Sequence, residues 1–291
     1  MRTKHYFFLV IILIFSTALK TDKPAYILYD LKGKSVKYKN LYNDAMKADV
    51  ILFGELHNNP ISHWLQLELT MDMHKESGDN LILAAEMFEA DDQLLLDEYI
   101  SGTIRQRNFE DEAKLWKNYT TDYKPLVEFA KTNNLKFVAS NIPRRYASVV
   151  HQRGFEALEA LPDDAKRYIA PLPVAYDPEL PGYKGMIEMM GGMGAGHAND
   201  NLPKAQAIKD ATMAHFILQN LKPGSKVIHY HGTYHSNNFE GIYWYLKNHN
   251  PNLNILTIAS VEQEEIDSLA VENAKLADYT ICVPATMTKT H

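Results

Sequence analysis

Four short apolar runs, each followed at once by polar residues, constrain the fold of this 291-residue chain more than any other feature. The first run, 50–53, is continuously apolar and ends at Gly54, which is typical of a strand buried on both of its faces. Similar runs occupy 81–85, 136–140 and 226–230. Because helical spacing fills most of the intervening chain, strands alternate with helices. The pattern predicts an α/β fold with a mostly parallel sheet flanked by helices.

Helix signals support this alternation. Asn59 is a favourable N-cap and Pro60 a favourable first helical residue, so a helix is expected to begin here and to end near Ser77. Further helices are predicted at 88–100, 123–133, 146–153 and 204–221. The last part of the chain predicts a strand at 254–259, an acidic helix at 263–275 and a closing strand at 279–283.

The first residues have the pattern of an export signal. Arg2 and Lys4 precede a short apolar run, and small residues follow it, so residues 1–18 are expected to be a secretory signal peptide. The run is about half of the roughly 20 residues that a membrane-spanning helix needs, and an uncleaved N-terminal anchor is the alternative. Cys282 is the only cysteine, so no lipobox cysteine follows the signal. The protein is therefore expected to be exported, as a periplasmic, cell-surface or secreted protein.

Residues 25–291 are expected to form one domain, since no linker interrupts them. The formal net charge is -6, and no basic stripe with interleaved aromatic residues is present, so nucleic acid is not an expected partner. One segment, about 155–203, breaks the α/β rhythm with six prolines and a run rich in methionine and glycine. It predicts a helical and irregular insertion that serves as a lid over a ligand, or else a disordered surface loop.

Polar side chains follow all four strands. The carboxyl ends of parallel strands share one edge of a sheet, where α/β proteins build their sites. The side chains expected to line a common crevice there are Glu55, His57, Glu86, Asn141, Arg144, Arg145, His231 and His235.

These residue types allow a hydrolytic site. His57, His63, His231 and His235 offer nitrogen ligands for zinc or manganese, with a carboxylate left as general base. His229 shares a strand face with His231, so either imidazole is a candidate for the crevice. A route without metal is also open, in which His57 acts as base. The catalytic residues of a hydrolase, either a peptidase or an esterase, would be Glu55, His57, Glu86 and His235.

The motifs together resemble the ChaN-like haem-binding proteins, part of a superfamily that includes the TIKI, TraB and erythromycin-esterase families. The resemblance covers nearly the whole mature chain. It rests on the stretches Gly54-Glu55-Leu56-His57-Asn58-Asn59-Pro60 with His63, Ala85-Glu86-Met87-Phe88, Asn141-Ile142-Pro143-Arg144, Asp210-Ala211-Thr212-Met213-Ala214 and Gly232-Thr233-Tyr234-His235. It implies a paired Gly-x-x-His signature, matched at His57 and His235, with acidic residues at Glu55 and Glu86.

The resemblance further implies iron-regulated haem uptake, a tyrosine ligand to haem iron and a dimer that holds cofacial haems. Haem is then the ligand, and an outer-membrane haem receptor and a second copy of the chain are the candidate partners. Members of this branch are attached to the outer membrane as lipoproteins. This sequence departs from that pattern, because it lacks the lipobox cysteine.

Haem requires apolar walls, an axial ligand for iron and cations for its two propionates. The apolar candidates are Trp64, Phe88, Tyr234, Trp244, Met190 and Met193. Arg144 and Arg145 are candidates for the propionates, and salt bridges to Glu55 or Glu86 are the alternative for both. The axial candidates are Tyr146, Tyr176, Tyr183, Tyr234 and His197. On the resemblance, haem binding is favoured over hydrolysis.

Overall fold

An eight-stranded sheet forms the centre of the computed structural model, which describes residues 23–191 and 201–291 but not the side chains of 189–191. Its order is β2-β1-β8-β7-β3-β6-β4-β5, and all neighbours pair in parallel except those of β1. The strands are β1 (Ile27–Asp30), β2 (Ser35–Val36), β3 (Val50–Glu55), β4 (Leu81–Glu89), β5 (Phe137–Asn141), β6 (Lys226–Gly232), β7 (Ile255–Gln263) and β8 (Tyr279–Pro284). The predicted α/β fold with a mostly parallel sheet is confirmed.

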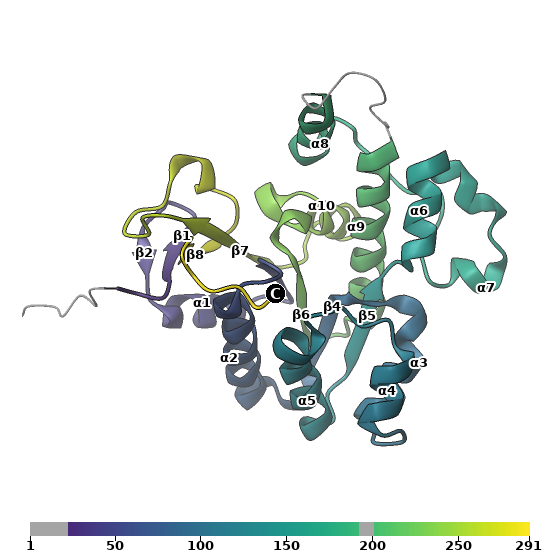
Figure 1. Ribbon diagram of the computed structural model, residues 1–291, viewed down its shortest axis with the longest axis horizontal. Coiled ribbons are helices and arrows are strands. Elements are labelled where there is room, and N and C mark those ends of the chain that lie inside the picture. Colours follow the sequence, from purple (N-terminus) through teal and green to yellow (C-terminus); the bar gives the residue numbers. More distant parts are fainter. Residues whose placement is uncertain (1–22, 192–200) are drawn as a thin grey trace, which may run out of the picture.

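Helices cover both faces of the sheet (Figure 1). Those of the described residues are α1 (Tyr38–Ala45), α2 (Pro60–Ser77), α3 (Gln93–Ile100), α4 (Gln106–Glu112), α5 (Lys124–Asn133), α6 (Arg144–Arg153), α7 (Asp163–Lys166), α8 (Pro181–Gly191), α9 (Asn201–Asn220) and α10 (Ile242–His249). Side chains of β3 alternate between two cores, because successive residues of a strand point to opposite faces. Ile51 and Phe53 pack with α1 to α5, whereas Val50 and Leu52 pack with α6, α9 and α10. Both faces of β3 are therefore buried, as its sequence predicts.

The strand order creates a crevice at the carboxyl edge of the sheet. From β3 the chain passes to β4 and β5, and it then returns to β6, which lies between β3 and β4. From β6 it continues to β7 and β8 on the other side of β3. The chain thus leaves β3 and β6 in opposite directions, and a gap opens between the connections at such a point. No helix of the described residues is both long and apolar enough to cross a membrane.

Two predicted helices differ from the structure. The helix expected at 88–100 begins only at Gln93, because β4 continues through an irregular register to Glu89 and buries Phe88 in the core. The prediction of an acidic helix at 263–275 is wrong, and the only helical turn there is the 3₁₀ turn Val271–Asn273. The Gln263 side chain explains this loop, since it donates to two backbone carbonyls and accepts from the Ala270 N–H. Side-chain bonds thus replace helical backbone bonds.

The insertion at about 155–203 contains a 3₁₀ turn, α7 and the helix α8, which stands at the top of Figure 1. The first turn of α8 is bound to the edge of the crevice. Gly182 N–H donates to Glu240 at 2.7 Å, and its carbonyl accepts from the Tyr234 hydroxyl at 3.2 Å. The part of the methionine-rich run that follows α8 lies outside the described residues.

Candidate functional site

A cavity of about 530 Å³ lies at the carboxyl edge, between β3, β4, β6 and α9. Its lining includes Glu55, His57, Glu86, Lys209, Gly232, Tyr234 and His235. Four of these are the residues predicted for a hydrolase site. The structure therefore brings Glu55, His57, Glu86 and His235 together at the end of the sheet.

Glu55 and His57 form the first part of the site. Glu55 is buried at the end of β3, and its carboxylate accepts hydrogen bonds from Gln66 at 2.6 Å, from the Tyr123 hydroxyl at 2.7 Å and from His57 Nδ1 at 2.9 Å. Because Nδ1 carries the donated proton, Nε2 of a neutral His57 keeps its lone pair. Burial lowers the pKa of His57, but the bond to Glu55 and the charge of Glu86 outweigh it and raise the pKa above its ordinary value.

Gly232 allows His57 to approach β6. A Cβ atom built on Gly232 would lie 2.7 Å from His57 Nε2 and 3.6 Å from Glu86 Oε2. The absence of a side chain at Gly232 therefore lets the imidazole lie against the β6 backbone, next to Glu86. His57 thus stands between two carboxylates that come from different strands.

Glu86 and His235 form the second part, together with Asp210 of α9. His235 Nε2 lies 3.2 Å from Glu86 Oε1, and Nδ1 lies 2.5 Å from Asp210 Oδ1. Glu86 also accepts from Gly232 N–H at 2.8 Å. With a carboxylate at each nitrogen, His235 is an imidazolium: burial lowers its pKa, but Glu86 and Asp210 outweigh this and raise it to about 10.

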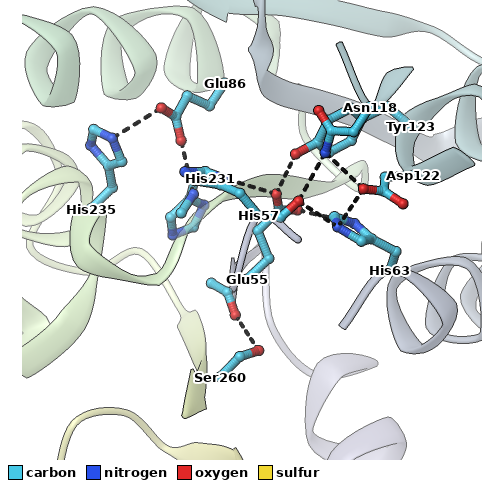
Figure 2. A network of polar contacts seen from close by, with 12 residues as sticks. Glu55, His57, His63, Glu86, Asn118, Asp122, Tyr123, His231, His235 and Ser260 are labelled. Atoms are coloured by element: carbon cyan, nitrogen blue, oxygen red, sulfur yellow. Dashed lines mark hydrogen bonds and ion pairs between the residues drawn. The ribbon is translucent and has the colours of Figure 1, made fainter. Parts of the chain in front are cut away.

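The pKa values of the two carboxylates in this group are shifted in opposite directions. Burial opposes ionisation of Glu86, but the charge and hydrogen bond of His235 are stronger and lower the pKa of Glu86. Burial raises the pKa of Asp210, despite His235 and the hydroxyl of Tyr183, which donates to it at 3.0 Å. Figure 2 shows Glu86 and His235 on one side of the network, and His57 and His63 with Asn118, Asp122 and Tyr123 on the other.

His63 lies behind His57 and not in the crevice. Its side chain is buried on the first turn of α2, and its Nε2 donates to the backbone carbonyl of His57 at 3.1 Å. Asn118 donates to the same carbonyl at 2.8 Å and to Asp122 at 2.7 Å. These contacts hold the backbone that carries His57, so His63 is a positioning residue.

His229 and His231 also point away from the crevice. Both are fully buried on the α9 side of β6, with their Nδ1 atoms 3.0 Å apart. His229 Nε2 lies 2.8 Å from the hydroxyl of Ser140, and His231 Nε2 lies 2.8 Å from that of Ser236. Burial lowers the pKa of both imidazoles, to about 3 for His229, so both are neutral. The expectation that either faces the crevice is wrong, because this face of the strand, which also carries Val227, belongs to the core formed with α6, α9 and α10.

The predicted metal ligands therefore do not converge. Of His57, His63, His231 and His235, only His57 and His235 line the cavity, and His235 has both nitrogens on carboxylates. Within residues 23–191 and 201–291, no three His, Cys, Asp or Glu side chains are arranged to hold a metal ion. The donor set does not fit zinc or manganese.

The residues predicted for haem lie in several places. Arg145 binds Asp91 at 2.6 Å and lies 4.4 Å from the centre of the Tyr146 ring. For Arg145, the alternative of a salt bridge to Glu55 or Glu86 is therefore wrong. Arg144 lines two cavities, and Tyr234, 48% exposed, lines the crevice. His197 and Met193 lie outside the described residues, and so does the Met190 side chain.

Some functional candidates were missed by the sequence analysis. Asp210 lies in one of the quoted motifs, where a carboxylate among the small and apolar residues of α9 was the available signal. Trp116 was missed entirely, although it lines two cavities. Its ring packs edge-on against that of His57, with the two ring centres 4.9 Å apart. Of the predicted apolar walls, Phe88 and Trp244 pack in the two cores, and Trp64 packs against Tyr26.

Fold and site together define an α/β protein with a histidine- and carboxylate-lined crevice at the carboxyl edge of a parallel sheet. The chain belongs to the family described as haem-binding uptake, Tiki superfamily, ChaN, whose model matches residues 41–246. No curated protein is significantly similar to the chain.

Three solved structures are similar to the chain, two of them with a TM-score of at least 0.50. ChaN of Campylobacter jejuni, described with cofacial haem binding, has a TM-score of 0.67 at 21% identity, over 88% of this chain and 96% of that one. A Bacillus cereus protein has a TM-score of 0.50 at 10% identity, over 84% and 90%. An erythromycin esterase mutant in its open conformation has a TM-score of 0.46 at 10% identity, over 88% and 82%. At these identities the first two similarities show the fold alone.

Proposed function

We propose that the protein binds haem in bacterial iron or haem acquisition and holds it at the carboxyl edge of the sheet, beside the insertion at about 155–203. Membership of the haem-binding ChaN family supports the ligand. The observation that supports the place is a group of adjoining cavities at this edge. The crevice that Tyr234 lines shares Glu86 and Lys209 with a cavity of about 280 Å³, which in turn shares Trp116 and Arg144 with one of about 840 Å³. The crevice and the largest cavity each fall within the roughly 300–1,000 Å³ of ligand sites, and aromatic and cationic side chains line the group, as haem requires.

Tyr234 is the described tyrosine best placed to be an axial ligand. Its side chain is half exposed at the crevice, and its hydroxyl has one weak bond, to the Gly182 carbonyl. Tyr183, by contrast, is buried and donates to Asp210. A tyrosinate oxygen at this position would favour ferric iron.

The test is a titration of the purified protein with ferric haem, followed in the Soret region. We expect saturable binding and a shifted Soret band, with an altered spectrum in Tyr234→Phe. His197→Ala is the parallel variant for the histidine candidate, and Tyr183→Phe is the matched control for loss of a tyrosine hydroxyl. If the wild-type protein shows no saturable binding, haem binding is refuted.

The remaining proposals concern the protein's location, its partner and its oligomeric state. Export through the signal at 1–18 makes the protein periplasmic, secreted or surface-exposed, with an outer-membrane haem receptor as its partner and a homodimer as its haem-bound state. Cell fractionation with sequencing of the mature N-terminus tests export, and scattering mass measured with and without haem tests the dimer. A cytoplasmic, unprocessed chain contradicts export, and an unchanged monomer mass with bound haem contradicts the dimer.

A second function, hydrolysis of a peptide or ester, is favoured by the geometry of His57. Its Nε2 lies beside Glu86 while Nδ1 donates to Glu55, so a neutral His57 is oriented to take a proton from water. His57→Ala separates the two functions. It should leave haem affinity unchanged if haem lies in the larger cavity, and it should abolish any esterase or peptidase activity. Wild-type protein without activity on a panel of esters and peptides would contradict this second function.

A further inference from the structure

Two cations that have no hydrogen bond or ion pair with the described residues line one small cavity at the carboxyl edge. Arg144, the first residue of α6, and the half-buried Lys209 of α9 both border a cavity of about 280 Å³. Neither has a hydrogen bond or an ion pair with the described residues. Their neighbours differ, since Arg145 binds Asp91 at 2.6 Å and Lys114 binds the same residue at 2.8 Å. Arg144 and Lys209 are therefore available to a ligand.

The acids of the same cavity have other cationic partners. Glu86 has the imidazolium of His235 at 3.2 Å and the Gly232 N–H at 2.8 Å. Glu89 lies 3.3 Å from the ammonium of Lys114, which also binds Asp91 at 2.8 Å and Asp92 at 3.5 Å. Arg144 and Lys209 are thus the cations of this cavity that are bound to none of its acids, and their charge favours an anion.

The other residues that line this cavity indicate what the rest of the ligand is like. Trp116, Ile142 and Ala147 add apolar surface. No side chain caps the start of α6, so the positive end of that helix reinforces Arg144. The ligand that fits carries carboxylates on a flat apolar body. The cavity continues into the larger one of about 840 Å³, with which it shares Trp116 and Arg144.

We propose that Arg144 and Lys209 bind the propionate carboxylates of haem in the smaller cavity, while the macrocycle lies against Trp116. This inference rests on the proposed haem binding and adds the orientation of the ligand. The sequence predicted that Arg144 and Arg145 bind the propionates. Because Asp91 binds Arg145, Lys209 of α9 takes its place beside Arg144 of α6.

The experiment compares two probes, ferric haem and its dimethyl ester, whose propionates carry no charge. Affinities are measured for wild type, Arg144→Gln and Lys209→Gln, with Arg145→Gln as the matched control from the adjacent position. Each of the first two variants should weaken haem binding roughly tenfold, which is about 1.4 kcal/mol. Neither should change affinity for the ester, and Arg145→Gln should change neither affinity. The position of the Soret band should stay the same in all variants, since the iron ligand is not altered.

The outcomes separate the inference from the proposed function. Wild type that binds neither probe refutes haem binding itself. If wild type binds haem but Arg144→Gln and Lys209→Gln lose nothing, or lose affinity equally for haem and its ester, the propionate site is refuted while haem binding stands. An equal loss in Arg145→Gln also refutes the site, because general surface charge then explains the effect.

Discussion

Substitution of Gly232 by alanine tests the contact on which the His57 arrangement depends. Gly232 has φ -58° and ψ 134°, which any residue can adopt, so the change brings no backbone strain. The new Cβ would lie 2.7 Å from His57 Nε2, whereas ordinary contacts begin at 3.4 Å, so the imidazole must move by about 0.7 Å. The side chain of His57 is 42% exposed, so the imidazole is free to turn outward. That movement breaks the 2.9 Å bond to Glu55.

The main expected effect is on the pKa of His57. The bond to Glu55 is a cause of its raised pKa, so the pKa should fall in Gly232→Ala. The free energy of unfolding should fall by only about 1 kcal/mol, because the lost bond is partly solvent-exposed and alanine restricts the unfolded chain. A proton NMR titration of the His57 Cε1–H signal and urea unfolding measure the two quantities.

Two other glycines provide the comparison. A Cβ on Gly185 has only the Tyr234 hydroxyl near it, at 4.0 Å, so Gly185→Ala should leave the His57 titration unchanged. A Cβ on Gly54 would lie 2.8 Å from the backbone of Ile258 and of Thr233, which cannot rotate away. Gly54→Ala should therefore destabilise the protein more than Gly232→Ala, by about 1–3 kcal/mol. If His57 keeps its raised pKa in Gly232→Ala, the proposed role of this close contact is refuted.

Three further predictions concern buried groups. The pKa of His235 is raised to about 10, so its stabilising contribution is complete below the unfolded pKa near 6.5 and is lost as pH rises to about 10; His235→Gln should remove a slope of up to about 1.4 kcal/mol per pH unit from urea unfolding curves. The pKa of His229 is lowered to about 3, so the stability that its neutral form contributes is lost as pH falls below about 6.5. His229→Gln should therefore lose less stability than wild type on acidification, when each protein is compared with its own stability at pH 7. Tyr123→Phe removes one of three donors to Glu55 and should lower the free energy of unfolding by about 1 kcal/mol while leaving haem affinity unchanged.

Opposite results would contradict these arguments in specific ways. An unchanged alkaline slope in His235→Gln would mean that this imidazole does not carry the extra proton. An acid transition that His229→Gln leaves in place would assign the acid sensitivity to other groups. A large loss of haem affinity in Tyr123→Phe would place haem against the Glu55 side of the network.

Much of the site could be predicted from sequence because it depends on strand ends. Glu55, His57 and Glu86 follow or end apolar runs, and parallel strands bring their carboxyl ends to one edge whatever the details of packing. Asp210 was not predicted as a site residue, since its partner His235 is 25 residues away and only the fold brings α9 next to the turn that follows β6. Trp116 lies in an irregular segment, for which no periodicity indicates a direction.

The sequence by itself determined the α/β alternation, the edge of the sheet at which polar side chains collect and the match to a haem-binding family. Only the tertiary structure decided which imidazoles face the crevice. A strand that is buried on both faces has no hydrophobic pattern to distinguish them, so nothing local separates His231 from His57. The helices decide the outcome. The core formed with α6, α9 and α10 covers the face of β6 that carries His229 and His231, while the close approach at Gly232 leaves His57 at the crevice with Glu55 and Glu86 on either side.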